Sequence, residues 1–89
     1  MGHIFRAIDV WRREEGGVLV RYRCFEVIPV EKFCVQSRDS YRLPFAEGLG
    51  SALDRQFLEL LAEEAPDIRS GLYDSIEEAI FNYDKEFEE

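Results

Sequence analysis

The sequence offers few side chains for nucleophilic, redox or metal chemistry. One histidine, His3, and two cysteines, Cys24 and Cys34, are present among 89 residues. The cysteine spacing matches neither a redox CxxC motif nor a zinc site, and no serine lies in a nucleophile elbow. We therefore expect no metal or other cofactor, no catalytic residue and no enzymatic activity. The cysteines are expected to be buried free thiols on opposite faces of a sheet, kept reduced in the cytoplasm.

Arginines recur at strand-like positions close to aromatic residues, a combination found in sheets that stack nucleic-acid bases. They are Arg21, Arg23, Arg38 and Arg42. The net charge of the whole sequence is −8, and an acidic protein repels a polyanion. We predict that these arginines form salt bridges with carboxylates of the same chain, and that the protein has no nucleic-acid partner.

The negative charge is concentrated in the second half of the sequence. Residues 1–44 hold eight Lys or Arg and six Asp or Glu, whereas residues 45–89 hold three and thirteen. Carboxylates near the C-terminal end of a helix oppose its dipole, so helix stability alone does not explain them. One interpretation is a solvated face that keeps the protein soluble, and the other is an acidic docking face for a basic protein partner. The candidate docking residues are Glu77, Glu78, Asp84 and Glu86.

An α+β fold whose strands come first must position these residues. The segment from His3 to Leu43 is rich in β-branched, aromatic and arginine residues, and its strong breaks are Gly16-Gly17 and Pro29. This spacing predicts an antiparallel meander of three strands, or four if the last is broken at Asp39-Ser40. The expected strand ranges are 4–12, 18–28 and 33–43.

Two helices are expected after the strands. The first begins at Ser51 as its N-cap residue and ends before Pro66, and the second begins at Ser75 with Glu78 completing a capping box. The simplest arrangement for this order is an antiparallel sheet with both helices packed on one face. The whole sequence, 1–89, is expected to form a single domain.

Both faces of the predicted sheet carry apolar residues, which a sheet with one solvated face does not require. We expect a four-residue second turn that pairs Ile28 with Phe33 and places Arg23 opposite Arg38. Two interpretations of the second apolar face remain open: a partner or second copy covers it, or a β-bulge shifts the phase of one strand. The candidate interface residues on this face are Ile8, Val10, Leu19, Arg21, Arg23 and Phe25.

These features favour a small non-catalytic protein-interaction module that self-associates through its sheet as a homodimer. The alternative is an acidic inhibitor of the immunity or antitoxin type, which neutralises a basic protein. No apolar segment approaches the roughly 18–20 residues of a membrane span, and the N-terminus lacks a signal-peptide apolar region. We expect a cytoplasmic protein with a protein partner and no membrane association.

Overall fold

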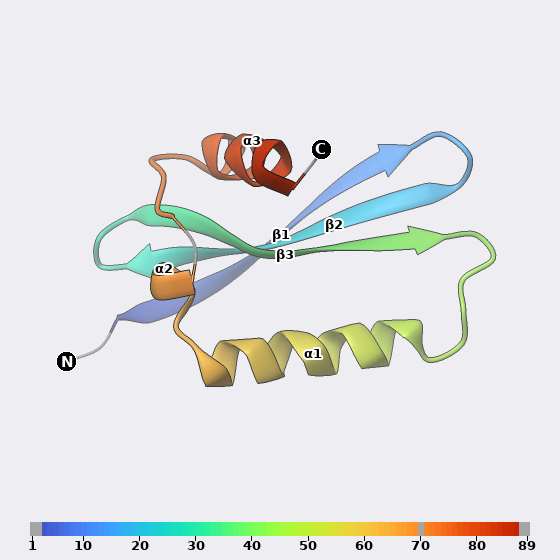
Figure 1. The fold of residues 1–89 in the computed structure, drawn as a ribbon, viewed down its shortest axis with the longest axis horizontal. Helices are drawn as coiled ribbons and strands as arrows, with labels where there is room; N and C mark the ends of the chain where they lie inside the picture. The colour runs from blue at the N-terminus through green and yellow to red at the C-terminus, as the bar shows by residue number, and fades with distance from the viewer. Residues whose placement is uncertain (1–2, 70, 88–89) are drawn as a thin grey trace.

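The computed structural model describes residues 3–69 and 71–87 and shows three long strands followed by helices (Figure 1). The elements are β1 (Ile4–Glu14), β2 (Val18–Ile28), β3 (Lys32–Arg42), α1 (Leu49–Glu63), α2 (Pro66–Arg69) and α3 (Ile76–Phe87). The strands form one antiparallel sheet in the order β1-β2-β3. The predicted α+β class and three-stranded meander are confirmed. Because β3 continues through Asp39-Ser40, no fourth strand arises there.

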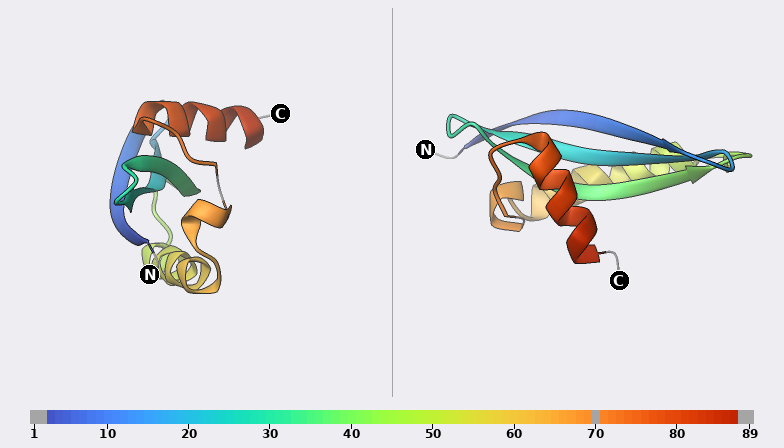
Figure 2. Two further views of the ribbon diagram at one scale, coloured as in Figure 1. Left: turned by 90° about the vertical axis from the view of Figure 1, so that its left-hand side faces the viewer. Right: turned by 90° about the horizontal axis from the view of Figure 1, so that it is seen from above.

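The two longer helices lie on opposite faces of the sheet, so the expected packing of both helices on one face is wrong. Figure 1 shows the sheet between α3 and α1, and the end-on view of Figure 2 shows the same three layers. α3 covers a core cluster that contains Tyr22 and Cys24, whereas α1 covers a second cluster that contains Phe25 and Val27. Successive residues of a strand point to opposite faces, so each helix covers one side of β2.

The central strand β2 is buried on both faces. Residues 22–25 are all buried, with no alternation between buried and exposed positions. A strand covered on both sides loses the alternation of apolar and polar residues that a half-exposed strand shows. This burial explains the apolar residues on the second face, and the cover is the chain's own α1.

A β-bulge at Gln36 shifts the phase of β3. Cys24 pairs with Val35 but Arg23 pairs with Ser37, so Gln36 has no partner on β2. Residues of β3 beyond the bulge therefore lie on the faces opposite to those of an uninterrupted strand. Both interpretations of the second apolar face hold in part. The bulge is present, and the face is buried, but it is α1 of the same chain that covers it and not a partner.

The second hairpin has a different register from the expected one. Val27 pairs with Lys32, because Glu31 closes the turn with an N–H that donates to the Val27 carbonyl at 2.9 Å. The expected pairing of Ile28 with Phe33 is therefore wrong. Glu31 adopts a left-handed φ of 57°, which is uncommon for a residue other than glycine.

The two helix starts differ in how well the sequence predicted them. α1 begins at Leu49 after Gly48, whose φ of 81° suits glycine, so the expected N-cap at Ser51 is wrong. α3 begins as predicted, since the Ser75 Oγ accepts a hydrogen bond from the Glu78 N–H at 3.1 Å. Within the described residues, no helix is both long enough and apolar enough to cross a membrane.

Candidate functional site: an ion-paired sheet with one open edge

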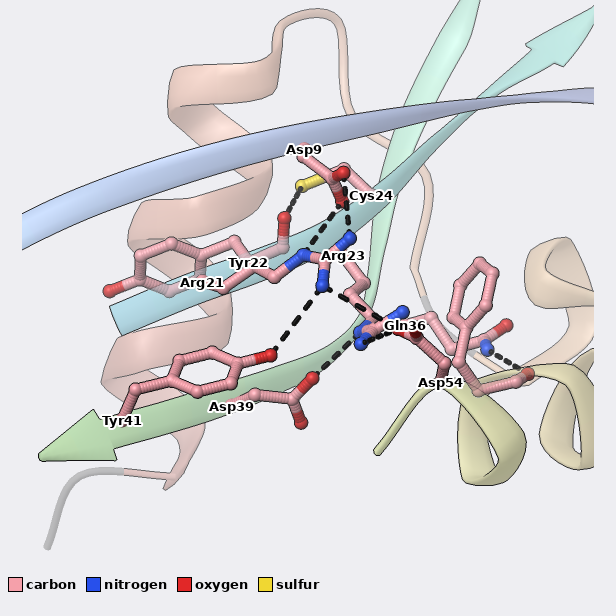
Figure 3. Close-up of polar contacts among 10 residues, drawn as sticks. Asp9, Arg21, Tyr22, Arg23, Cys24, Gln36, Asp39, Tyr41 and Asp54 are labelled. Carbon is pink, nitrogen blue, oxygen red and sulfur yellow. Dashed lines mark hydrogen bonds and ion pairs between the residues drawn. The ribbon is translucent and has the colours of Figure 1, made fainter. Parts of the chain in front are cut away.

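On the α1 side of the sheet, two arginines of β2 form a network with three carboxylates (Figure 3). Arg21 binds Asp9 with two hydrogen bonds, from Nε at 3.2 Å and from Nη2 at 2.9 Å. Arg23 donates from Nε to Asp39 and from Nη2 to Asp54, both at 2.7 Å. The sequence-based expectation that Arg21 and Arg23 form internal salt bridges is confirmed.

Arg23 is the most deeply buried charge of this network. Its side chain is 4% exposed, and its guanidinium lies 4.9 Å from the ring centroid of Phe57 on α1. A buried charge is tolerated only when it is paired and hydrogen-bonded, and two carboxylates meet this need. The hydrogen bond from Arg23 lowers the pKa of Asp54. Because Asp54 lies on α1 and Arg23 on β2, this ion pair also connects α1 to the sheet.

On the α3 side, Asp84 is the centre of a second network. Its carboxylate accepts hydrogen bonds from the Tyr22 hydroxyl and from Arg38, both at 2.7 Å, and from Arg12 at 3.3 Å. Arg38 reaches this face because the bulge places it opposite Tyr22, and not opposite Arg23 as expected. Burial raises the pKa of Tyr22, and its hydrogen bond to Asp84 raises it further.

The four predicted docking residues divide into two kinds. Asp84 is half-buried and faces the sheet, where three neighbours bind it, whereas Glu77, Glu78 and Glu86 are exposed on α3. Phe81 lies beside Glu77 and Glu78 on the outer side of α3 and is 67% exposed, whereas Glu86 lies on the side of α3 that faces β3. Glu88 and Glu89, which extend the acidic run in the sequence, lie outside the described residues.

The six predicted interface residues do not share one face, so that prediction is wrong as a single surface. Ile8 pairs with Cys24 and Val10 with Tyr22, which places both under α3. The others point to the α1 side: they are Leu19, Arg21, Arg23 and Phe25. Phe25 is 2% exposed because the ring of Phe57 stacks on it at a centroid distance of 5.5 Å.

Cys24 and Cys34 are free and buried on opposite faces of the sheet, as predicted. Burial raises the pKa of Cys24 to about 12 and that of Cys34 to about 11. Both thiols are therefore protonated near neutral pH, where only a thiolate acts as a nucleophile. Their surroundings are those of core residues.

The outer edge of β1 has no strand partner within residues 3–69 and 71–87. β1 pairs with β2 along its entire length, from Ile4 with Ile28 to Glu14 with Val18. The opposite edge of the sheet is partly capped, since Phe33 of β3 exchanges two backbone hydrogen bonds of 2.8 Å with Tyr73. The meander order makes both outer strands edges, but no sequence signal identified which edge the later chain caps.

Aromatic residues gather at the end of the sheet near the first hairpin, a cluster that sequence reasoning missed. The ring of Trp11 on β1 lies 5.7 Å from that of Tyr41, which lies 6.5 Å from that of Phe45. Arg21 lies 5.2 Å from the Trp11 ring centroid, in cation–π geometry. Trp11 is 51% exposed, so this cluster extends the surface beside the open edge.

His, Cys, Asp and Glu, the side chains that most often bind metal ions, all occur among the described residues. Among these residues, no group of three His, Cys, Asp or Glu side chains is placed to hold a metal ion. His3 instead contacts Asp67 through Nδ1 at 2.9 Å. Comparisons of the chain with protein-family models, with curated proteins and with solved structures found no match.

Proposed function

We propose that this protein is a non-catalytic interaction module that pairs the open edge of β1 with a strand of a second copy. The observation that carries the proposal is an edge strand of 11 residues whose outer side has no partner in the described chain. Natural proteins usually shorten, cover or cap such edges, because unpaired backbone groups invite pairing with another chain. Strand addition is a common way to use an edge of this kind in binding.

The burial of both sheet faces supports the edge as the route of association. α1 and α3 already cover the faces, so a partner that joins the sheet meets its flank (Figure 2). Every charged residue of β1 except Arg13 is in an ion pair within the chain, which limits the repulsion of an incoming strand. The pairs are Arg6 with Glu26 at 2.6 Å, Asp9 with Arg21 at 2.9 Å, and Arg12 with Glu14 at 2.7 Å.

An edge-blocking substitution tests the proposal. Ala7 is an exposed, small residue in the middle of β1, and a lysine on an edge strand opposes edge-to-edge pairing. We expect the mass of the unmodified protein, measured by light scattering, to rise with concentration from 10.4 kDa to twice that value. Ala7→Lys should remain monomeric throughout. The fluorescence of Trp11, the single tryptophan, should change on association only in the protein that dimerises.

The matched control is Ala62→Lys, the same change at an exposed position of α1. This control should dimerise like the unmodified protein. If the unmodified protein stays monomeric at every concentration, self-association is refuted. Equal dimerisation of Ala7→Lys would instead place the interface away from the β1 edge.

A basic protein partner that docks on the outer side of α3 is the second candidate. The observation that favours it is the separation of paired from unpaired charge. Arg12, Arg21, Arg23 and Arg38 bind carboxylates of the chain, whereas Glu77 and Glu78 form no ion pair among the described residues. The unpaired charge is thus mainly negative, and the exposed ring of Phe81 supplies an apolar anchor within it.

A further inference from the structure

A cavity of about 350 Å³ lies between β3 and α3. Its walls come from β3, from the segment 71–73 and from α3. The volume is within the range of small-molecule sites, roughly 300–1,000 Å³. The proposed function does not use this cavity, because β1 lies on the other flank of the sheet.

Aromatic rings and one carboxylate determine the chemistry of the cavity. Tyr73, Tyr83 and Phe87 line it, and the rings of Tyr83 and Phe87 lie 4.7 Å apart. Glu86 is the only charged residue among the described residues of the lining. Aromatic faces attract cations, and a carboxylate beside them strengthens the preference for positive charge.

The bulged residue Gln36 also lines the cavity, but its side-chain amide is held on the α1 side of the sheet. Its side chain is 3% exposed, and its Nε2 donates to the Phe57 carbonyl at 3.2 Å (Figure 3). The other end of the amide, Oε1, is buried and accepts no hydrogen bond. Because this oxygen is covered by protein atoms, Gln36 contributes to the wall of the cavity and offers no acceptor to a ligand. Bulges often redirect a side chain next to a binding site.

We infer that this cavity binds a small organic cation, a guanidinium or ammonium group on a short apolar stem. The rings of Tyr73, Tyr83 and Phe87 contact the stem and the cationic face. Glu86 provides the opposite charge. The cation is either a free molecule or the end of an arginine or lysine side chain from another protein.

A pair of probes of equal shape tests the charge preference. Butylguanidinium carries the cation, and butylurea replaces it with a neutral group of the same form. Titrations followed by NMR should show saturable shifts of the backbone amides of Gln36 and of 71–73 when butylguanidinium is added. Butylurea should bind at least about tenfold more weakly. Equal affinities, or no shift with either probe, would overturn the inference.

Substitutions of the wall locate the binding. Glu86→Gln should weaken butylguanidinium binding about tenfold and remove its advantage over butylurea. Glu59→Gln, the same change at an exposed position of α1, should leave both affinities unchanged. Phe87→Leu keeps the charge but removes a ring, and should weaken the cationic probe more than the neutral one. Unchanged affinities in both wall variants would place the probe outside this cavity and overturn the inference.

A peptide arm distinguishes the two sources of the cation. A five-residue peptide with one central arginine between glycines, blocked at both ends, is titrated in the same way. Peptide binding at least as tight as that of butylguanidinium assigns the cavity to a partner's side chain. Binding of butylguanidinium without binding of the peptide assigns it to a free small cation. Both outcomes support the shared chemistry.

Discussion

At the scale of single residues, the carboxylates of this chain have different tasks that their shared charge conceals. Asp84 and Asp54 each receive hydrogen bonds from β2, and they connect α3 and α1 to the sheet. Glu77, on the same helix as Asp84, is exposed and binds no cation among the described residues. Removing the carboxylate should therefore have different effects at these positions.

We predict that Asp84→Ala lowers the free energy of unfolding by about 1–3 kcal/mol. The substitution leaves the Tyr22 hydroxyl and the Arg38 guanidinium without their acceptor at a partly buried position. Urea denaturation followed by circular dichroism measures the change. Glu77→Ala is the control, and it should alter the free energy of unfolding by less than about 0.5 kcal/mol. Equal losses in the two variants would contradict the assigned role of Asp84.

At the scale of elements, α3 presents one face to the sheet and a different chemistry to the solvent. Ala79 is buried against the core, whereas Phe81 and the neighbouring glutamates point outward. α1 contains no buried residue, although Phe57 and Leu61 pack against the sheet. The outer side of α3 is therefore the surface on which a basic partner is to be sought.

Charge reversal at matched sites tests that surface. The double variant Glu77→Lys/Glu78→Lys should lose most of the capture of a basic partner from a cell lysate at low salt, by about tenfold or more. The control Glu59→Lys/Glu63→Lys makes the same change in net charge on α1 and should keep the capture. Affinity purification followed by mass spectrometry gives the comparison. Similar losses in both variants would mean that overall charge, and not this face of α3, attracts the basic protein.

At the scale of the whole molecule, three buried groups couple stability to alkaline pH in the same direction. Burial raises the pKa of Cys24 to about 12 and of Cys34 to about 11, and it also raises the pKa of Tyr22. Each group therefore favours its protonated form in the folded state. Their contribution is complete below the unfolded-state values, about 8.5 for a thiol and 10 for a tyrosine. It is lost as the pH rises through the folded values, because the unfolded chain ionises first.

We predict that the free energy of unfolding falls by a few kcal/mol between about pH 8.5 and pH 11. Urea titrations at a series of pH values, with reductant present, measure the slope. The double variant Cys24→Ala/Cys34→Ala should start from a lower stability and show a shallower decline. A slope that is the same in both proteins would exclude the thiols as its cause.

The sequence predicted the elements better than their relative placement. Hydrophobic pattern and turn residues located all three strands and the Ser75 cap, because these are local effects. The position of α1 depends on which face of the sheet it covers, and the apolar stripe of a helix does not specify that face. The apolar residues on both faces left two interpretations open, cover by a partner or a bulge; the structure has the bulge, and the cover comes from α1 of the same chain.

The candidate sites were predicted less well, again for physical reasons. The separation of Ile8 from Phe25 follows from the register of the first hairpin, and a shift of one residue reverses every side chain. The internal role of Asp84 depends on a residue brought from β3 by the bulge. Pairings between segments so far apart in the chain leave no periodic signal in the sequence.

The bulge at Gln36 also determines how the chain would tolerate a change in its length. Deleting this one residue would remove the bulge and leave Val35 opposite Cys24 and Ser37 opposite Arg23, the pairs that already flank it. Arg38 would stay opposite Tyr22, and Asp39 would stay opposite Arg21. A single-codon deletion at this point would thus keep the partners of both charge networks and remove only the local irregularity of the strand. The exposed first hairpin is the other place where the chain can change in length, and no atom lies within 4 Å of a Cβ added at Gly16.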